Sequence, residues 1–151
     1  MLDKVVVSDT SCFIALTNIE GLSLLQKLYK QIYTTSIVIK EFGDKLPNWV
    51  KLIEVEDLQK QKLLEFQIDK GEASAVVMAL EQSADLIIVD DNKARLVAKK
   101  LGLQVTGTLG IIKAKKAGVI TLAKPLLENL RRTNFRISDD LLNEALMLAG
   151  E

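Results

Sequence analysis

The stretch Lys4-Val5-Val6-Val7-Ser8-Asp9-Thr10-Ser11, near the start of the chain, decides how the fold is expected to form. Its β-branched run predicts a short strand over Lys4–Ser8. The polar group Asp9–Ser11 ends that strand and supplies an N-cap for an apolar helix over Cys12–Leu16. The sequence therefore predicts a strand, a turn and a helix in direct succession, with Asp9 at the junction.

A second stretch repeats this arrangement in the middle of the chain. The continuous apolar run Leu86–Val89 is typical of a buried parallel strand, and Asp90-Asp91-Asn92 ends the strand and caps a helix over Lys93–Leu101. Ligands of α/β folds bind at the carboxyl ends of the strands. Asp9 and the pair Asp90-Asp91 are therefore expected at the same edge of one sheet.

The rest of the chain continues this alternation of strands and helices. Further strands are expected over 32–35, 52–55 and 103–105, and further helices over 22–29, 36–42, 57–66, 72–82, 107–118, 125–132 and from 138 to near the C-terminus. No linker or repeat interrupts the pattern. The chain is interpreted as one domain over 1–151, an α/β protein with a three-layer α/β/α sandwich around a mainly parallel sheet.

Composition limits the chemistry that this protein can perform. The 151 residues include no histidine, which excludes Ser-His-Asp and Cys-His catalysis and argues against zinc. Twenty Lys and Arg balance twenty Asp and Glu, so a nucleic acid would have to meet a local basic patch. The single cysteine, Cys12, lies in an apolar stretch and is interpreted as a small buried hydrophobe.

Two glutamates could join the aspartates at the strand ends. Glu41 lies late in the helix after the second strand, and Glu72 begins a helix just after Gly71. Four or five carboxylates would then converge, and such packing of like charges is costly unless a cation compensates. Oxygen ligands without histidine favour Mg²⁺ or Mn²⁺, whose natural task is hydrolysis of a phosphodiester bond by activated water.

Each of these acids also has a purely structural interpretation. Asp9 and the Asp90-Asp91 pair could serve only as helix caps, and Glu72 only as a favourable charge at a helix N-terminus. An acid near a helix C-terminus is unfavourable, so Glu41 favours a functional interpretation. Thr108, at another helix start, could bind a phosphate or only cap its helix.

Basic residues on the predicted helix after Asp91 are candidate contacts for the phosphates of a nucleic acid. Lysine and arginine on a helix are, in the alternative interpretation, only a solvated face. The candidates are Lys93, Arg95, Lys99 and Lys100.

The order and spacing of these motifs resemble the PIN-domain family across nearly the whole chain. The motifs are Val-Ser-Asp9-Thr-Ser11, Glu41, Gly71-Glu72-Ala-Ser-Ala and Ile-Val-Asp90-Asp91-Asn-Lys-Ala-Arg95. The closing Gly107-Thr-Leu-Gly110, with Ile-Ile-Lys-Ala-Lys-Lys-Ala-Gly after it, resembles a prokaryotic branch described as nucleic-acid-binding proteins encoded like toxin ribonucleases.

The resemblance implies a nuclease site with Mg²⁺ or Mn²⁺ as cofactor. By position it makes Asp9, Glu41, Glu72 and Asp91 the acidic quartet, with Ser11 as a supporting hydroxyl. Either aspartate of the pair Asp90-Asp91 could fill the last position, and Asp91 is favoured because Ala94 and Arg95 follow it in the usual register. Many relatives have aspartate where this chain has Glu72, so its longer side chain is expected to reach the metal through water.

The resemblance further implies an endoribonuclease with RNA as substrate that is the toxin of a toxin–antitoxin pair. Its expected partners are a cognate antitoxin and a second copy of the chain in a homodimer. A non-catalytic PIN-type module that binds RNA or protein is the alternative. A phosphoacceptor receiver domain also gathers acids at strand ends, but the lysine that it needs at a later strand end is not found. The chain shows no membrane-spanning run and no signal peptide, so a cytoplasmic protein is expected.

Overall fold

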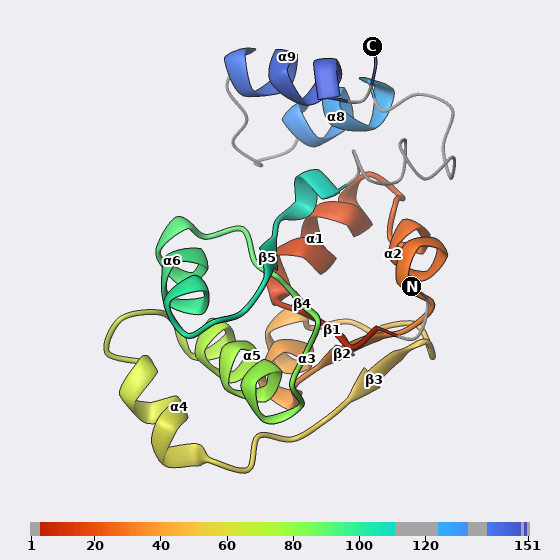
Figure 1. Cartoon of the computed structure of the whole chain (residues 1–151). Helices are drawn as coiled ribbons and strands as arrows, with labels where there is room; N and C mark the ends of the chain where they lie inside the picture. The colour runs from red at the N-terminus through yellow and green to blue at the C-terminus, as the bar shows by residue number, and fades with distance from the viewer. Residues whose placement is uncertain (1–3, 111–123, 133–138, 149, 151) are drawn as a thin grey trace.

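A parallel β-sheet runs through the centre of the computed structural model, which describes residues 4–110, 124–132, 139–148 and 150. Its five strands lie in the order β3-β2-β1-β4-β5, and each described pairing is parallel (Figure 1). The strands are β1 (Val6–Ser8), β2 (Ile32–Thr34), β3 (Val50–Leu52), β4 (Leu86–Ile88) and β5 (Val105–Thr106). The α/β fold with a parallel sheet, predicted from the alternation of elements, is confirmed.

Helices cover both faces of this sheet (Figure 1). They are α1 (Thr10–Asn18), α2 (Ser23–Tyr29), α3 (Ser36–Phe42), α4 (Leu58–Leu64), α5 (Lys70–Glu81), α6 (Asn92–Lys100), α8 (Lys124–Arg132) and α9 (Asp139–Leu148), with the 3₁₀ helix η1 at Thr108–Gly110. One core lies under α1 and α2 and includes residues of α8 and α9, while the other lies under α5 and α6. The protein is thus a three-layer sandwich.

Alternation along the central strands supplies the two cores. Val6 and Ile88 point into the core under α1, whereas Val7 and Ile87 point into the core under α5. All four side chains are at most 2% exposed. Because β1 and β4 are buried on both faces, they read as continuous apolar runs in the sequence, as parallel strands typically do.

The two central strands end side by side. Ser8 pairs with Ile88 in the register of β1 and β4, so the residues that follow the two strands leave the sheet at one edge. Asp9 follows β1, and Asp90 and Asp91 follow β4 after Val89. The predicted meeting of these aspartates at one sheet edge therefore follows directly from the register.

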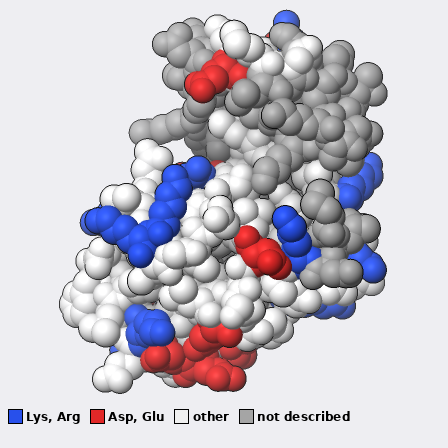
Figure 2. Space-filling view, in the orientation of Figure 1, with Lys and Arg blue, Asp and Glu red and all other residues white. Residues whose placement is uncertain are grey.

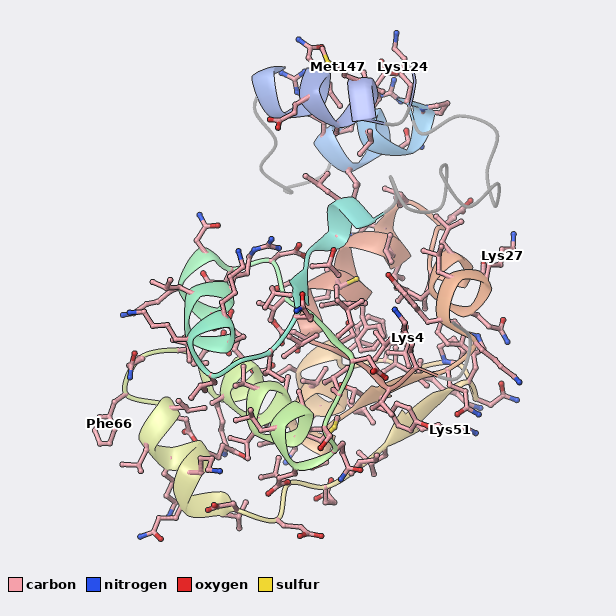
Figure 3. All side chains as sticks on the ribbon, in the orientation of Figure 1. Lys4, Lys27, Lys51, Phe66, Lys124 and Met147 are labelled. Carbon is pink, nitrogen blue, oxygen red and sulfur yellow. The ribbon has the colours of Figure 1, made fainter. Side chains whose placement is uncertain are left out.

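The α4 region extends from the sandwich and is held by an acid from α5. Glu81 accepts hydrogen bonds from the backbone N–H groups of Glu56 and Asp57 (3.0 and 2.7 Å), just before α4 begins. Past the end of α4, Phe66 is 86% exposed and its ring points away from the protein (Figure 3). The acid near the C-terminus of α5 thus serves as a backbone anchor.

Some predicted boundaries differ from the structure. The third strand occupies Val50–Leu52 rather than 52–55, because Pro47 and Trp49 lead directly into the pairing with β2. Beyond Leu52 the ladder gains one more bond, from Ile53 N–H to Thr34 C=O (2.9 Å). Of the helix predicted over 107–118, the structure describes η1, and residues 111–118 lie outside the described part. In the ranges that are described, no helix is long and apolar enough to cross a membrane.

Candidate active site

Asp9 lies at the junction between β1 and α1 and is almost completely buried, at 3% exposure. Its backbone N–H donates to the carbonyl of Ile88 (3.0 Å), which fixes it beside the end of β4. It occupies the N-cap position of α1, but its carboxylate makes no side-chain capping bond. Helix capping therefore does not account for this buried acid.

Glu41 reaches the same region from the last turn of α3. Its Oε1 accepts a hydrogen bond from the Thr10 hydroxyl (2.8 Å), and Thr10 directly follows Asp9. The carboxyl group also lies against the backbone of Gly71, where a Cβ would stand 2.8 Å from Glu41 Cδ. A side chain at position 71 would thus displace Glu41.

The start of α5 adds two further carboxylates, joined in a capping box. Asp69 Oδ1 accepts from the backbone N–H of Glu72 (2.8 Å), and Glu72 Oε1 accepts from the backbone N–H of Asp69 (3.2 Å). Each acid uses one carboxylate oxygen in this exchange. Glu72 is 7% exposed, so the arrangement buries a second acid near Asp9.

Asp91 joins the group from the start of α6. It is the N-cap of α6, and its Oδ2 accepts from the backbone N–H of Ala94 (2.9 Å). Its charge is among those that raise the pKa of Glu72. We refer to the five carboxylates together as the acidic cluster: Asp9, Glu41, Asp69, Glu72 and Asp91.

Burial and mutual repulsion shift two pKa values in the acidic cluster. Burial raises the pKa of Asp9 to about 7, against a lowering by the Thr10 backbone N–H, and the charges of Glu72, Asp69 and Glu41 raise it further. Burial likewise raises the pKa of Glu72 to about 7, with Asp69, Asp91 and Glu41 adding repulsion. Among the described residues, no ion pair joins a lysine or arginine to the cluster.

Asp90, the neighbour of Asp91, faces a different set of groups. Its Oδ1 accepts from the backbone N–H of Thr108 (2.6 Å), and its Oδ2 accepts from the Thr108 hydroxyl. Burial raises its pKa, but the Thr108 bonds and the positive charge of Arg95 act in the opposite direction. We call Asp90, Arg95, Gly107 and Thr108 the Asp90 clip, since they join the end of β4 to η1.

The clip also determines where Arg95 and Thr108 lie. Arg95 Nη1 donates to the Val89 carbonyl (3.0 Å), and a Cβ at Gly107 would come within 2.8 Å of Asp90 Oδ1. Thr108 is 3% exposed and donates twice to Asp90. Both residues thus have structural partners here, and the clip brings neither of them into the acidic cluster.

Ser11 and Cys12 follow Thr10 in α1, and neither is part of the acidic cluster. Ser11 is exposed in the first turn of α1, and its hydroxyl makes no hydrogen bond to another described residue. The hydroxyl that contacts a cluster carboxylate is that of Thr10. Cys12 is buried, and burial raises the pKa of its thiol to about 12, which keeps it protonated as the apolar interpretation requires.

A basic surface lies on α6, the helix that Asp91 caps. Lys93, Lys99 and Lys100 are all exposed, and basic side chains gather over α6 in the space-filling view (Figure 2). They extend from the first turn of the helix to its last. These three lysines make up the basic surface of α6.

Sequence reasoning missed two members of this site. Asp69 could have been found, because Asp69 and Glu72 have the spacing of a capping box before a helix. Thr10 carried no such signal, since its bond to Glu41 joins residues 31 positions apart. It depends on how α1 and α3 pack.

The acidic cluster has the donor chemistry of a site for a hard divalent cation. Its ligands are carboxylate oxygens with no histidine or thiolate, which is the set that Mg²⁺ and Mn²⁺ prefer. As the side chains are placed, no three acidic, histidine or cysteine side chains among the described residues are grouped tightly enough to hold a metal ion. One oxygen of Glu41 and one of Glu72 accept hydrogen bonds from the protein instead.

Comparison with known proteins agrees with this architecture. A family model described as a PIN domain matches residues 5–151. A search of curated proteins finds no match to the chain. The matched range includes all five strands, every member of the acidic cluster and the Asp90 clip. The PIN domain is a nuclease-type fold, and this chain belongs to the PIN-domain family.

Proposed function

We propose that this protein is a Mg²⁺- or Mn²⁺-dependent endoribonuclease that hydrolyses RNA phosphodiester bonds at the acidic cluster. The observation that carries the proposal is the convergence of five carboxylates without a protein cation, two of them with pKa values raised to about 7. Such a cluster repels itself unless protons or a cation neutralise it. A bound divalent cation would offset this repulsion and would also serve the hydrolysis.

The residues divide by their place in the cluster. Asp9, Glu41 and Asp91 would hold the metal, and Glu72 would add a ligand or orient water. Asp91 is favoured over Asp90, because the oxygens of Asp90 are occupied by Thr108. Asp69 would support Glu72 through the capping box.

The bound metal would activate water and stabilise charge on the leaving oxygen. Water attacks the phosphorus, the P–O bond to the leaving oxygen breaks, and a phosphate monoester and a free hydroxyl result. Thr10 donates to one oxygen of Glu41, and no described hydrogen bond engages the other oxygen. Asp9 is 3% exposed, so little bulk water reaches it.

Lys93 and Lys99 would contact phosphates of the RNA along α6. Both are exposed on the helix whose N-cap belongs to the acidic cluster. Arg95 would act chiefly through the Asp90 clip, because its guanidinium already donates to Val89 C=O. This basic surface supplies the local positive charge that a chain of zero net charge needs to meet a polyanion.

The resemblance to toxin ribonucleases supports a more specific form of the proposal. The protein would be the toxin of a toxin–antitoxin pair, a single PIN-like domain over 1–151 that acts as a homodimer in the cytoplasm and is inhibited by a cognate antitoxin. These statements rest on the motifs quoted above rather than on the geometry of the acidic cluster.

A non-catalytic PIN module that binds RNA or protein is the second candidate. One observation favours it: among the described residues no three potential ligands are grouped to hold a metal as they stand. In such a protein the acidic cluster would remain without turnover. The two candidates differ in whether a metal-dependent cut can be measured.

The test is cleavage of a panel of single-stranded and structured RNAs with Mg²⁺, Mn²⁺ or EDTA. Wild type is compared with Asp91→Asn, which retains a good helix cap, and with Asp44→Asn, the same change at an exposed aspartate outside the acidic cluster. The proposal predicts metal-dependent cutting by wild type and Asp44→Asn and its loss in Asp91→Asn. Binding of RNA by folded wild type with no cutting under any metal would favour the binding module.

A further inference from the structure

A buried pair of hydroxyl groups joins the two helices that carry Glu41 and Glu72. Thr35 and Ser74 are 1% and 0% exposed, and their hydroxyl oxygens lie 2.7 Å apart. Thr35 is the N-cap of α3, and Ser74 lies in the first turns of α5. Neither residue belongs to the acidic cluster.

Counting donors and acceptors fixes the direction of each bond in this pair. Thr35 Oγ1 accepts from the backbone N–H of Val38 (3.2 Å), and Ser74 Oγ donates to the carbonyl of Gly71 (2.7 Å). Each hydroxyl has a single hydrogen. Since Ser74 gives its hydrogen to Gly71, Thr35 must be the donor in the bond between the two side chains. The result is one chain of bonds from the Val38 N–H to the Gly71 C=O.

This chain of bonds ends at the glycine against which Glu41 is packed. The Gly71 carbonyl accepts a hydrogen bond from the Ser74 hydroxyl, and the Glu41 carboxyl group packs against the Gly71 Cα. Glu41 lies on α3, six positions after the cap residue Thr35. The contacts between α3 and α5 therefore include the hydroxyl pair and the contact of Glu41 with Gly71. Glu72 directly follows Gly71 in the sequence.

We propose that Thr35 and Ser74 are positioning residues that set the distance between Glu41 and Glu72 through Gly71. Without the pair, α3 and α5 would remain packed but could slide or rotate, and Glu41 would leave Gly71. The metal-binding part of this inference rests on the proposed function. The positional part does not, because it concerns the metal-free protein.

The first readout is the position of Glu41, measured by NMR on the metal-free protein. Wild type is expected to show a nuclear Overhauser contact between the Glu41 side chain and the Gly71 Hα protons. Thr35→Val and Ser74→Ala should lose this contact, while Thr35→Ser, which keeps the hydroxyl, should retain it. Val76→Ala, which creates a cavity in the buried part of α5, is the control for lost stability. It should retain the contact.

The second readout is the affinity for Mn²⁺ alone, measured by calorimetry well below the melting temperature of each variant. Thr35→Val and Ser74→Ala should weaken binding about tenfold, the lower end of the effect of groups that orient metal ligands. Thr35→Ser and Val76→Ala should stay within about twofold of wild type by the same scale.

Persistence of the contact of Glu41 with Gly71 in both folded variants, Thr35→Val and Ser74→Ala, would overturn the inference. Loss of the contact in a protein whose wild type binds no Mn²⁺ would retain the positioning role and reject the metal-dependent nuclease instead. Loss of the contact with unchanged Mn²⁺ affinity in both variants, where wild type binds Mn²⁺, would overturn the metal-binding part of the inference.

Discussion

The acidic cluster and the Asp90 clip both adjoin the end of β4, and they differ in how carboxylate charge is balanced. In the Asp90 clip, one aspartate receives two hydrogen bonds from Thr108 and lies near the positive charge of Arg95. In the acidic cluster, five carboxylates share backbone N–H groups and one threonine hydroxyl, with no ion pair to a described lysine or arginine.

The comparison separates an acid that is compensated by protein donors from acids that are compensated only in part. A buried carboxylate whose donors come from the protein stabilises the fold, and Asp90 is of this kind. Burial and neighbouring charges raise the pKa values of Asp9 and Glu72 despite their backbone donors, as happens often at functional sites. Asp90 and Asp91 are adjacent in the sequence, yet Asp90 lies in the clip and Asp91 in the acidic cluster.

Asp9→Asn tests the acidic cluster most severely. We expect RNA cleavage to fall by more than about 100-fold, since loss even of groups that only support a metal ligand costs about 10- to 100-fold. The variant should fold, with a melting temperature in EDTA at pH 8 at least equal to that of wild type, because one repelling charge is removed. Rates under single-turnover conditions provide the measurement, and cleavage at the wild-type rate would remove Asp9 from the site.

Gly71→Ala tests the packing of Glu41 without changing a charge. The new Cβ would lie 2.8 Å from Glu41 Cδ, so the carboxyl group must move. We expect Mn²⁺ affinity to weaken about tenfold, as for other groups that orient ligands. Gly110→Ala is the matched control, because a Cβ there meets Thr106 Oγ1 at an ordinary 3.9 Å. Equal affinities in the two variants would show that Glu41 does not bind the metal.

Asp90→Ala and Asp91→Asn should separate stability from function. Asp90→Ala leaves the N–H and hydroxyl of Thr108 without their acceptor, at an expected cost of about 1–3 kcal/mol in the free energy of unfolding. Asp91→Asn retains the cap of α6 and should change stability little. Urea unfolding of both variants in EDTA measures this, and a larger loss in Asp91→Asn would reverse the assignment.

The pH dependence of stability should also report the acidic cluster. The folded-state pKa values of Asp9 and Glu72, about 7, exceed their ordinary values of 3.8 and 4.5, so the folded protein binds these protons more tightly than the unfolded chain. Their contribution to stability is therefore fully present below about pH 4 and is lost as pH rises to 7, by at most about 1.4 kcal/mol per pH unit for each group.

Thermal unfolding between pH 4 and 8 in EDTA and in Mn²⁺ measures this effect. A bound cation replaces the protons, so saturating Mn²⁺ should remove the loss of stability toward neutral pH. If the metal-free wild type loses no more stability between pH 5 and 7 than Asp9→Asn does, the raised pKa value of Asp9 is contradicted.

The smallest effect is expected at the basic surface of α6. Lys99→Ala should raise the KM for RNA a few-fold and reduce the slope of log affinity against log salt by about one, with kcat unchanged. Lys27→Ala, an exposed lysine on α2, is the control. Equal salt slopes in wild type and Lys99→Ala would exclude a phosphate contact at Lys99.

How much of this could be predicted follows from the range of the interactions involved. The central strands β1 and β4, the caps at Asp57 and Asp91 and the sheet edge shared by Asp9 and Asp91 follow from local patterns, and the structure contains them. The bond of Thr10 to Glu41 and the clip between Asp90 and Thr108 join residues far apart in sequence. These depend on how the helices pack, which periodicity does not specify.

The choice between Asp90 and Asp91 illustrates the same limit. Both follow β4 in an identical acidic context, and the register of the resemblance favoured Asp91. In the structure, Thr108, 17 residues beyond Asp91, supplies the donors that engage Asp90.

Calorimetric titration of Mn²⁺ into the metal-free protein tests the central claim most directly. The acidic cluster, not the Asp90 clip, should bind the cation, so Asp91→Asn should weaken binding at least about tenfold while Asp90→Asn stays within about twofold of wild type. Failure of folded wild type to bind Mn²⁺, or equal weakening by the two substitutions, would contradict the account.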